Sequence, residues 1–206
     1  IYSNIIKVNS YLLSSNIAEI FIILIMVLFD FPGSLVATHL LFINLLTDAF
    51  PAFAIAMEKK EDGIMDRKPR IKDSSIMEGK LKFLVLFRSI FITMSVIGSF
   101  IFSYNMYTVN DAVTICFSTL VISELFMSYS LRTEKYIGLK KELFENKYLN
   151  KCIFISIFIF ILTLYIPILN IIFSTVPLNI EKIIMSLAFS LISIVGSELC
   201  KIFVDD

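Results

Sequence analysis

The sequence has few residues suited to hydrolytic or redox chemistry. Among its 206 residues there is one histidine, and the three cysteines, Cys116, Cys152 and Cys200, are scattered along the chain. A single histidine cannot build a Ser/His/Asp triad or an HExxH zinc site, and the cysteines form no CxxC pair or disulfide framework. A glycine-rich phosphate-binding loop is also missing. The sequence therefore argues against the common hydrolases, structural zinc sites and redox proteins.

The charge of the chain has no excess of either sign. There are 18 basic and 18 acidic residues, so the net charge of zero gives no support to a nucleic-acid partner. A basic amino-terminal region with a cleavage site is not found, and no secretory signal peptide is predicted. Because the chain starts at Ile1 rather than at a methionine, we expect it to be an excerpt from a longer protein.

Hydrophobic residues, in contrast, are abundant. They make up 57% of the chain, and the mean hydropathy is +0.85, whereas a soluble domain is about 45–50% apolar. A bilayer core is about 30 Å thick and requires roughly 20 mostly apolar residues of helix. Six stretches meet this requirement: 11–29, 35–56, 82–104, 111–130, 151–171 and 182–203. The predicted fold is an all-α polytopic membrane domain over residues 1–206, with six transmembrane helices in a lipid bilayer.

The basic residues predict how these helices are oriented. Cytosolic loops of membrane proteins carry an excess of lysine and arginine. If the chain start is cytosolic, the loops 58–80 and 132–150 lie inside, and so does every lysine and arginine except Lys182. Six crossings return the end of the chain to the same side, so both termini are predicted to be cytosolic.

Four acids lie within the predicted spans: Glu19, Asp48, Glu124 and Glu198. An acid inside a membrane costs about 2.5–3.5 kcal/mol on insertion scales and therefore indicates a functional site. At 1.5 Å per residue, the first three lie about 16–20 Å from the outer ends of their helices, and thus near one level. Glu198 lies close to the polar end of its span at Lys201 and is predicted to be an interfacial or snorkelling acid.

Polar neighbours surround the acids of the first two spans. Asn16 precedes Glu19 by three residues, so the two share a helix face. Asn44 and Thr47 share a face with Asp48 in the same way. Carboxylate, amide and hydroxyl oxygens are the ligands of hard cations such as calcium, which takes six to eight oxygen ligands. We interpret these residues as candidate cation ligands.

A proline in the second span adds to this interpretation. Pro51 lacks the N–H that would bond to the Thr47 carbonyl, so a free carbonyl is expected beside Asp48. Broken helices with unwound carbonyls coordinate ions in many transporters. The alternative is that Pro51 only kinks the helix and that Asn44 bonds to a neighbouring helix. His39, near the outer end of this span, is predicted to be an interfacial hydrogen-bonding residue rather than a ligand.

Three segments resemble one protein family. The run LLSSNIAE (12–19), followed by NLLTDAFPA (44–52), resembles the fifth and sixth transmembrane helices of type II P-type cation-transporting ATPases. The run DGIMDRKPR (62–70) resembles the cytosolic loop that follows the sixth helix in this family. The last four spans have the spacing of helices seven to ten, so the resemblance covers essentially the whole chain. At its ligand positions the chain looks most like a sarco/endoplasmic-type calcium pump.

The resemblance implies a function and a set of ligands. The family pumps cations through a phosphorylated aspartate, and the implied ligands of the transported Ca²⁺ are Asn16, Glu19, Asn44, Thr47, Asp48 and Glu124. The implied partners are the first four helices and the cytosolic phosphorylation, nucleotide-binding and actuator domains of the parent pump, on which ATP and Mg²⁺ act. This chain alone is therefore expected to be inactive and to supply no catalytic residue. The implied location is a bacterial cell membrane or an intracellular calcium-store membrane.

Two alternatives to a calcium pump remain. The chain could belong to a sodium/potassium pump or another cation pump of the same family. Sodium pumps resemble it at Ser15, Asn16 and Asp48, although they usually carry an aspartate where Asn44 stands. The chain could also be a membrane remnant that does not transport. A phosphorylation motif, Asp-Lys-Thr-Gly-Thr, encoded upstream of Ile1 would support a pump.

Overall fold

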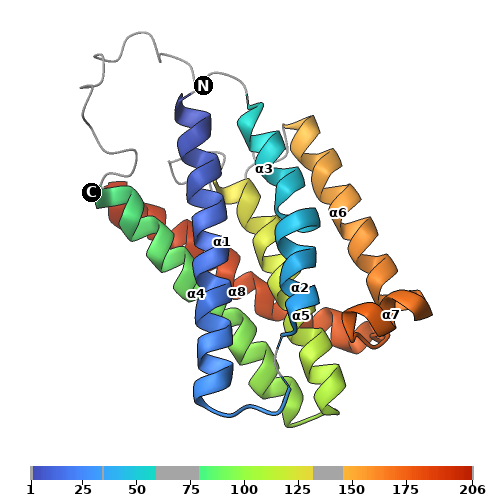
Figure 1. Cartoon of the computed structure of the whole chain (residues 1–206). Coiled ribbons are helices and arrows are strands. Elements are labelled where there is room, and N and C mark those ends of the chain that lie inside the picture. The colour runs from blue at the N-terminus through green and yellow to red at the C-terminus, as the bar shows by residue number, and fades with distance from the viewer. Residues whose placement is uncertain (1, 34, 59–78, 132–145, 206) are drawn as a thin grey trace, which may run out of the picture.

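The computed structural model describes residues 2–33, 35–58, 79–131 and 146–205, and its secondary structure in this part of the chain is helical (Figure 1). The elements are α1 (Tyr2–Leu28), α2 (Ala37–Phe42), the π-helical turn η1 (Ile43–Thr47), α3 (Ala49–Ala56), α4 (Gly79–Tyr104), α5 (Val109–Ser130), α6 (Lys147–Tyr165), α7 (Pro167–Phe173) and α8 (Ile180–Asp205). The segment 62–70, which carries part of the family resemblance, lies outside the described residues.

Six helical stretches are long and apolar enough to cross a membrane: α1, the α2–η1–α3 stretch, α4, α5, α6 and α8. The chain is a multi-pass membrane protein with an all-helical fold, and the predicted fold class is confirmed. Helix α5 lies at the centre and is the most buried of the six, with α4 and α8 packed against it. Many hydroxyl side chains bond to carbonyls of their own helix, as Ser118 does to Thr114 at 2.7 Å. Small residues of this kind let membrane helices approach closely.

The first helix begins earlier than the predicted span. Helix α1 starts at Tyr2, nine residues before the predicted boundary at 11, because hydropathy marks the part of a helix within lipid and not its ends. The early turns of α1 contact the end of α3. The Asn4 side-chain amide donates hydrogen bonds to the backbone carbonyls of Ala56 at 3.0 Å and Glu58 at 2.8 Å. These bonds satisfy carbonyls that the end of a helix leaves free.

The second span consists of three pieces. The backbone N–H of Asp48 donates to the carbonyl of Ile43 at 2.9 Å, which is the five-residue spacing of a π turn. Pro51 has no N–H to offer the Thr47 carbonyl, and the next donor, Ala52, bonds to the Asp48 carbonyl at 3.0 Å. Helix α3 runs through Pro51, so the break in the second span lies at the wide π turn immediately before Asp48 and not at the proline itself.

The predicted end of the fifth span is wrong. The span was expected to continue to residue 171, but α6 ends at Tyr165 and a separate short helix, α7, begins at Pro167. Ile166 between them has extended backbone angles, φ −89° and ψ 118°, which are favoured in the residue before a proline. Pro167 then occupies the first position of α7, where its missing N–H costs nothing.

The α4–α5 link and the start of α8 meet at one end of the bundle. The Lys182 ammonium lies 2.6 Å from the Asp111 carboxylate. The Tyr107 hydroxyl donates to Glu181 at 2.8 Å, and this bond is the main reason why the pKa of Tyr107 is raised above its ordinary value. Because the hydroxyl must be protonated to donate, this contact is present at neutral pH and is lost only as the pH rises through that raised pKa.

Candidate ion-binding site

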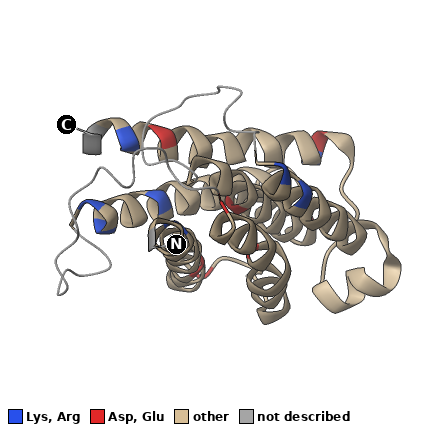
Figure 2. Ribbon diagram, turned by 90° about the horizontal axis from the view of Figure 1, so that it is seen from above, with Lys and Arg blue, Asp and Glu red and all other residues tan. Residues whose placement is uncertain are grey.

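Three helices place acids within the interior of the bundle. Glu19 comes from α1, Asp48 follows η1, and Glu124 comes from α5; their exposed fractions are 6%, 0% and 0%. Seen from above, acidic segments lie among the helices in the middle of the view, and others lie on the helix along its upper edge (Figure 2). Charged groups within a membrane are costly, so three of them on three different helices indicate a site with a function.

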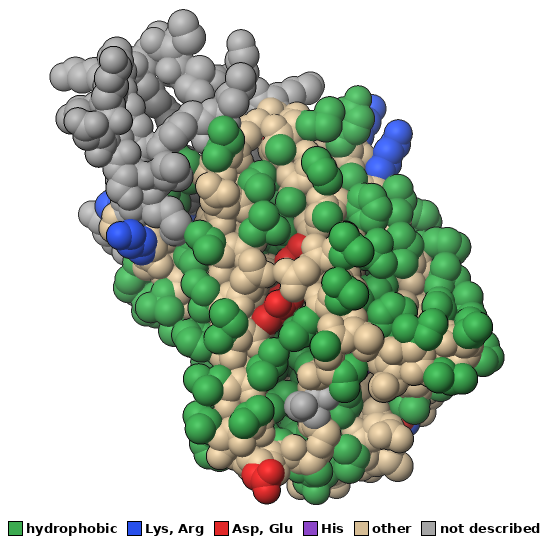
Figure 3. All heavy atoms as spheres, in the orientation of Figure 1, with side chains coloured by type: hydrophobic (Ala, Val, Ile, Leu, Met, Phe, Trp, Pro, Cys, Tyr) green, Lys and Arg blue, Asp and Glu red, His purple; other side chains and the backbone are tan. Residues whose placement is uncertain are grey.

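The first part of the site is the pair of Glu19 and Asn44. The Asn44 side-chain nitrogen donates to both carboxylate oxygens of Glu19, at 3.0 Å and 2.9 Å. Asn44 is exposed on the surface of the chain. Acidic atoms reach the surface near the middle of the face formed by α1 and α2, with hydrophobic side chains around them (Figure 3). This half of the site is therefore open at the surface of the chain.

The second part of the site is fully buried. The Tyr11 hydroxyl donates to Oδ1 of Asp48 at 2.8 Å, and neither residue is exposed. The other carboxylate oxygen of Asp48, Oδ2, has no hydrogen-bond partner among the described residues. The adjacent Thr47 hydroxyl donates to the Ile43 carbonyl at 2.9 Å, so its oxygen lies against the π turn.

Glu124 and Ser15 complete the buried part. Both carboxyl oxygens of Glu124 and the Ser15 hydroxyl are buried and lack a hydrogen-bond partner in the part of the chain that the structure describes. The Ser15 hydroxyl lies next to the Asp48 and Glu124 carboxyl groups but does not form a hydrogen bond of good geometry with either. Buried polar atoms without partners cost about 1–3 kcal/mol each. A bound polar ligand would remove that cost.

The described side chains do not form a complete metal site as they are arranged in the structure. Asn16 is half-buried on α1 and belongs to neither pair. Across the described ranges, no three histidine, cysteine or acidic side chains are close enough to hold a metal ion together. Coordination of a cation would therefore need amide, hydroxyl and carbonyl oxygens in addition to the carboxylates, and some movement of the side chains.

Sequence reasoning missed Tyr11 and Ser15. Both lie on the same face of α1 as Glu19, at intervals of four residues, and this spacing is visible in the sequence. Tyrosine and serine are ordinary residues in apolar helices, however, and the sequence does not reveal which residues of α1 face Asp48 and Glu124.

Glu198 and His39, which were not predicted to be ligands, have defined partners. Oε1 of Glu198 accepts hydrogen bonds from the Ser130 hydroxyl at 2.5 Å and from the Lys201 ammonium at 2.6 Å, so it joins the ends of α5 and α8. His39 is fully buried and stacks on Phe117 with ring centroids 4.3 Å apart. Its Nδ1 accepts a hydrogen bond from the backbone N–H of Val36 at 3.2 Å.

Comparison with known proteins gives consistent matches. The profile of the family "Cation transporting ATPase, C-terminus" matches residues 32–203. A calcium-transporting ATPase of Bacillus subtilis is 36% identical over 87% of this chain and 20% of its own length. Calcium-transporting ATPase 1 of Bacillus cereus is 28% identical over 98% of this chain and 24% of its own length. The endoplasmic reticulum-type calcium-transporting ATPase 3 of Arabidopsis thaliana is 25% identical over 98% of this chain and 23% of its own length. The chain thus spans less than a quarter of the length of these relatives.

Proposed function

Because the chain belongs to the family of cation-transporting ATPase C-terminal domains, we propose that it is the ion-binding membrane part of an ATP-driven calcium pump. What supports this function most directly is that three helices bring buried acids together, with several carboxyl oxygens left without partners among the described residues. The curated relatives reported above are named as calcium-transporting. Buried carboxylates with amide and hydroxyl neighbours match the oxygen ligands that calcium prefers.

The proposed calcium ligands are the six residues Asn16, Glu19, Asn44, Thr47, Asp48 and Glu124. Calcium binds oxygen at about 2.3–2.6 Å, so an asparagine ligand must present its carbonyl oxygen and not its nitrogen. In the structure the Asn44 nitrogen donates to Glu19. Ion binding on this side therefore requires the Asn44 amide to release Glu19 and turn over.

The open half of the site suggests where the rest of the pump lies. Next to Glu19 and Asn44, the side chains of Ile20, Leu41 and Leu45 are exposed by 61%, 64% and 63%. We infer that the first four helices of the parent pump cover this face and add further oxygen ligands. ATP and Mg²⁺ act on its phosphorylation and nucleotide-binding domains, with the actuator domain as a further partner, and both termini of this chain lie on the cytosolic side.

Calcium uptake by the parent pump tests this function. We expect inverted membrane vesicles that contain the pump to accumulate radioactive calcium when ATP is added. Glu124→Gln should abolish uptake, because an amide removes one of the buried charges that balance the ion. The matched control is Glu181→Gln, which changes an acid on α8 that bonds to Tyr107 at one end of the bundle, outside the candidate site. This variant should retain uptake.

Three outcomes of this experiment would count against the proposal. Transport of a different cation in place of calcium would show that the proposed ion is wrong. Normal calcium uptake by the Glu124→Gln pump would show that the site is wrong. The absence of ATP-driven transport in the wild-type pump would contradict the pump function itself.

A further inference from the structure

Tyr11 occupies a defined position against the candidate site. Its ring lies on α1 and is fully buried, and its hydroxyl oxygen is 2.8 Å from Oδ1 of Asp48, which comes from a different helix. Among the described residues, Tyr11 is the one that donates a hydrogen bond of good geometry to the Asp48 side chain. The other carboxyl oxygen, Oδ2, has no partner among them.

The backbone around Asp48 explains why its carboxyl needs to be held. Asp48 ends a π turn whose hydrogen bond runs to Ile43, and the neighbouring Thr47 side chain bonds back to the same carbonyl. Neither bond restrains the Asp48 side chain, which has two rotatable bonds of its own. A tyrosine ring fixed in a packed core can restrain it, because a phenol held by packing donates in one direction.

We propose that Tyr11 is a positioning residue: its hydroxyl holds Oδ1 of Asp48 so that Oδ2 faces the transported cation. The inference rests on the proposed function. Each carboxylate oxygen has two lone pairs, so Oδ1 can accept the hydrogen bond from the Tyr11 hydroxyl and still face a second cation. The ring itself makes no contact with the ion, so Tyr11 acts only through the carboxylate.

The sign of the effect follows from the charge of Asp48. When it binds a cation, Asp48 is a carboxylate, and a hydrogen bond to a charged acceptor is about twice as strong as a neutral one. The bond from Tyr11 is therefore kept in the ion-bound state, where orientation matters most. Removing the hydroxyl alone should lower the apparent calcium affinity about tenfold, which corresponds to the loss of one hydrogen bond to a charged group.

The test compares two isosteric changes in the full-length parent pump. Tyr11→Phe removes the hydroxyl that contacts Asp48. The matched control, Tyr129→Phe, removes a hydroxyl on α5 that donates to Asn150 Oδ1 at 3.0 Å and not to an acid of the site. Purified pumps are assayed for ATP hydrolysis against free calcium and, separately, against free strontium, a larger cation of the same chemistry.

We expect Tyr11→Phe to raise the half-saturating calcium concentration and leave the maximal turnover nearly unchanged. Its preference for calcium over strontium should fall severalfold, because a loosely held carboxylate discriminates less by ion size. Tyr129→Phe should resemble wild type in affinity and in selectivity. A role of Tyr11 in packing alone would reduce the amount of folded pump or its turnover without changing the ratio of the two affinities.

The outcomes separate this inference from the proposed function. If the wild-type pump shows no calcium-dependent hydrolysis, the proposed function fails and the inference with it. If wild type responds to calcium but Tyr11→Phe has unchanged or higher calcium affinity, only the inference is overturned. The same holds if the selectivity is unchanged, or if Tyr11→Phe fails to accumulate while Tyr129→Phe accumulates, because the hydroxyl would then serve folding.

Discussion

At the scale of single residues, two of the three buried acids accept hydrogen bonds from neutral side chains on other helices. The Asn44 amide bonds to Glu19, and the Tyr11 hydroxyl bonds to Asp48. Buried polar groups are nearly always hydrogen-bonded, and these donors satisfy both carboxyl oxygens of Glu19 and one of Asp48. Glu124 has no such donor among the described residues. Under the proposed function, a cation would compete with these donors for the same carboxyl oxygens.

Neutralising Asp48 and neutralising Glu19 should have different effects on ion stoichiometry. Asp48 is fully buried, whereas Glu19 lies at the open side with Asn44. A carboxylate at the centre can bind separate cations with its two oxygens. We therefore expect Asp48→Asn to abolish calcium binding at both of two sites, and Glu19→Gln to weaken chiefly one site and leave about one ion bound per pump.

Equilibrium binding of radioactive calcium to the full-length pump measures this difference. Glu181→Gln, which changes an acid in the first turn of α8, serves as the control and should bind as wild type does. An Asp48→Asn pump that still binds two ions would refute the central role of Asp48. A wild-type stoichiometry of one ion would refute the two-site arrangement.

The acids could be found from the sequence because charge is rare within apolar spans. Glu19, Asp48 and Glu124 interrupt long hydrophobic runs, and their depth could be calculated from the helical rise. Tyr11 and Ser15 could not be found in this way. Serine side chains in this chain commonly bond to their own helix, as Ser14 does to the Ser10 carbonyl, and only the packing of α1 against other helices makes Ser15 different.

At the scale of helices, two prolines have different consequences. Pro51 lies inside a span that continues past it, and the irregular backbone occurs before it, at η1. Pro167 ends α6 and starts α7. The sequence predicted a break in the second span because Pro51 lacks the N–H that would bond to the Thr47 carbonyl beside Asp48. It did not predict the break at Pro167, because the residues on both sides of that proline are equally apolar and hydropathy does not mark a change of direction.

Pro51→Ala should regularise the second span at the expense of ion binding. Alanine supplies the N–H that can bond to the Thr47 carbonyl, which adds about 1 kcal/mol of stability. The carbonyl is then no longer available to a cation beside Asp48. We expect a higher thermal unfolding temperature in detergent and a severalfold lower calcium affinity. Pro167→Ala, far from the acids along the chain, should leave the affinity unchanged. An unaltered affinity in Pro51→Ala would mean that the Thr47 carbonyl is not a ligand.

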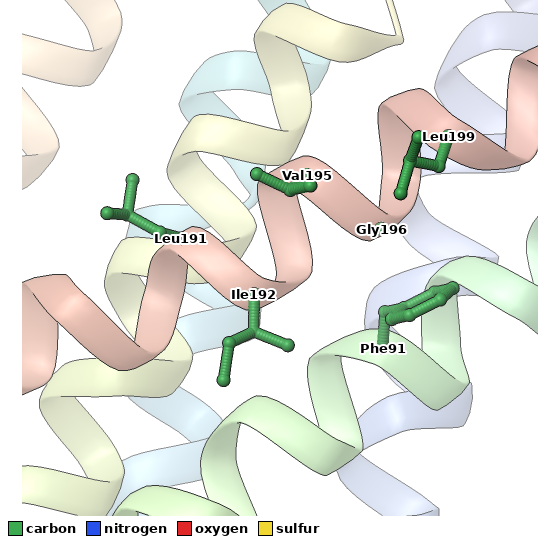
Figure 4. Close-up of a pocket in the computed structure, with 6 residues that line it drawn as sticks. All are labelled: Phe91, Leu191, Ile192, Val195, Gly196 and Leu199. Atoms are coloured by element: carbon green, nitrogen blue, oxygen red, sulfur yellow. The ribbon is translucent and has the colours of Figure 1, made fainter.

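The contact between α4 and α8 depends on a glycine. Phe91 of α4 lies over Gly196 of α8 (Figure 4), and a Cβ atom at Gly196 would be 2.3 Å from Cγ of the Phe91 ring. Because Cγ is near the root of that side chain, the ring cannot move away without displacing a helix. We expect Gly196→Ala to destabilise the folded protein by about 1–3 kcal/mol.

Thermal unfolding in detergent measures this effect on the α4–α8 contact. The matched control is Gly79→Ala at the start of α4, where an added Cβ meets nothing within 4 Å. Combining Gly196→Ala with Phe91→Leu, a smaller side chain, should recover part of the loss. Equal stability of the two alanine variants would show that α4 and α8 can move apart to accommodate the added Cβ without loss of stability.

At the scale of the whole molecule, polar contacts define the two ends of the bundle. At one end, Asn4 of α1 bonds to the end of α3, and Lys201 of α8 bonds to the Ser130 carbonyl at the end of α5. At the other end, Lys182 pairs with Asp111. The sequence predicted the six spans from hydropathy, and lysine and arginine predicted only which loops face the cytosol. Which end faces the cytosol is not defined by helix packing, so the orientation stays a prediction from the basic residues.

Cysteine labelling in intact cells tests that orientation. The three native cysteines, Cys116, Cys152 and Cys200, are first replaced by serine or alanine. A single cysteine is then placed at Asn105, exposed in the α4–α5 link, or at Lys147, exposed at the start of α6. Because Lys147 lies at the basic end of the bundle and Asn105 at the opposite end, an impermeant maleimide should label one position from each side of the membrane. In a pump of the plasma membrane the outside reagent should reach Asn105→Cys alone, and Lys147→Cys should react only after the cells are opened. Labelling of both positions from the same side would contradict the six-span topology, and labelling of Lys147→Cys alone from outside would reverse the orientation.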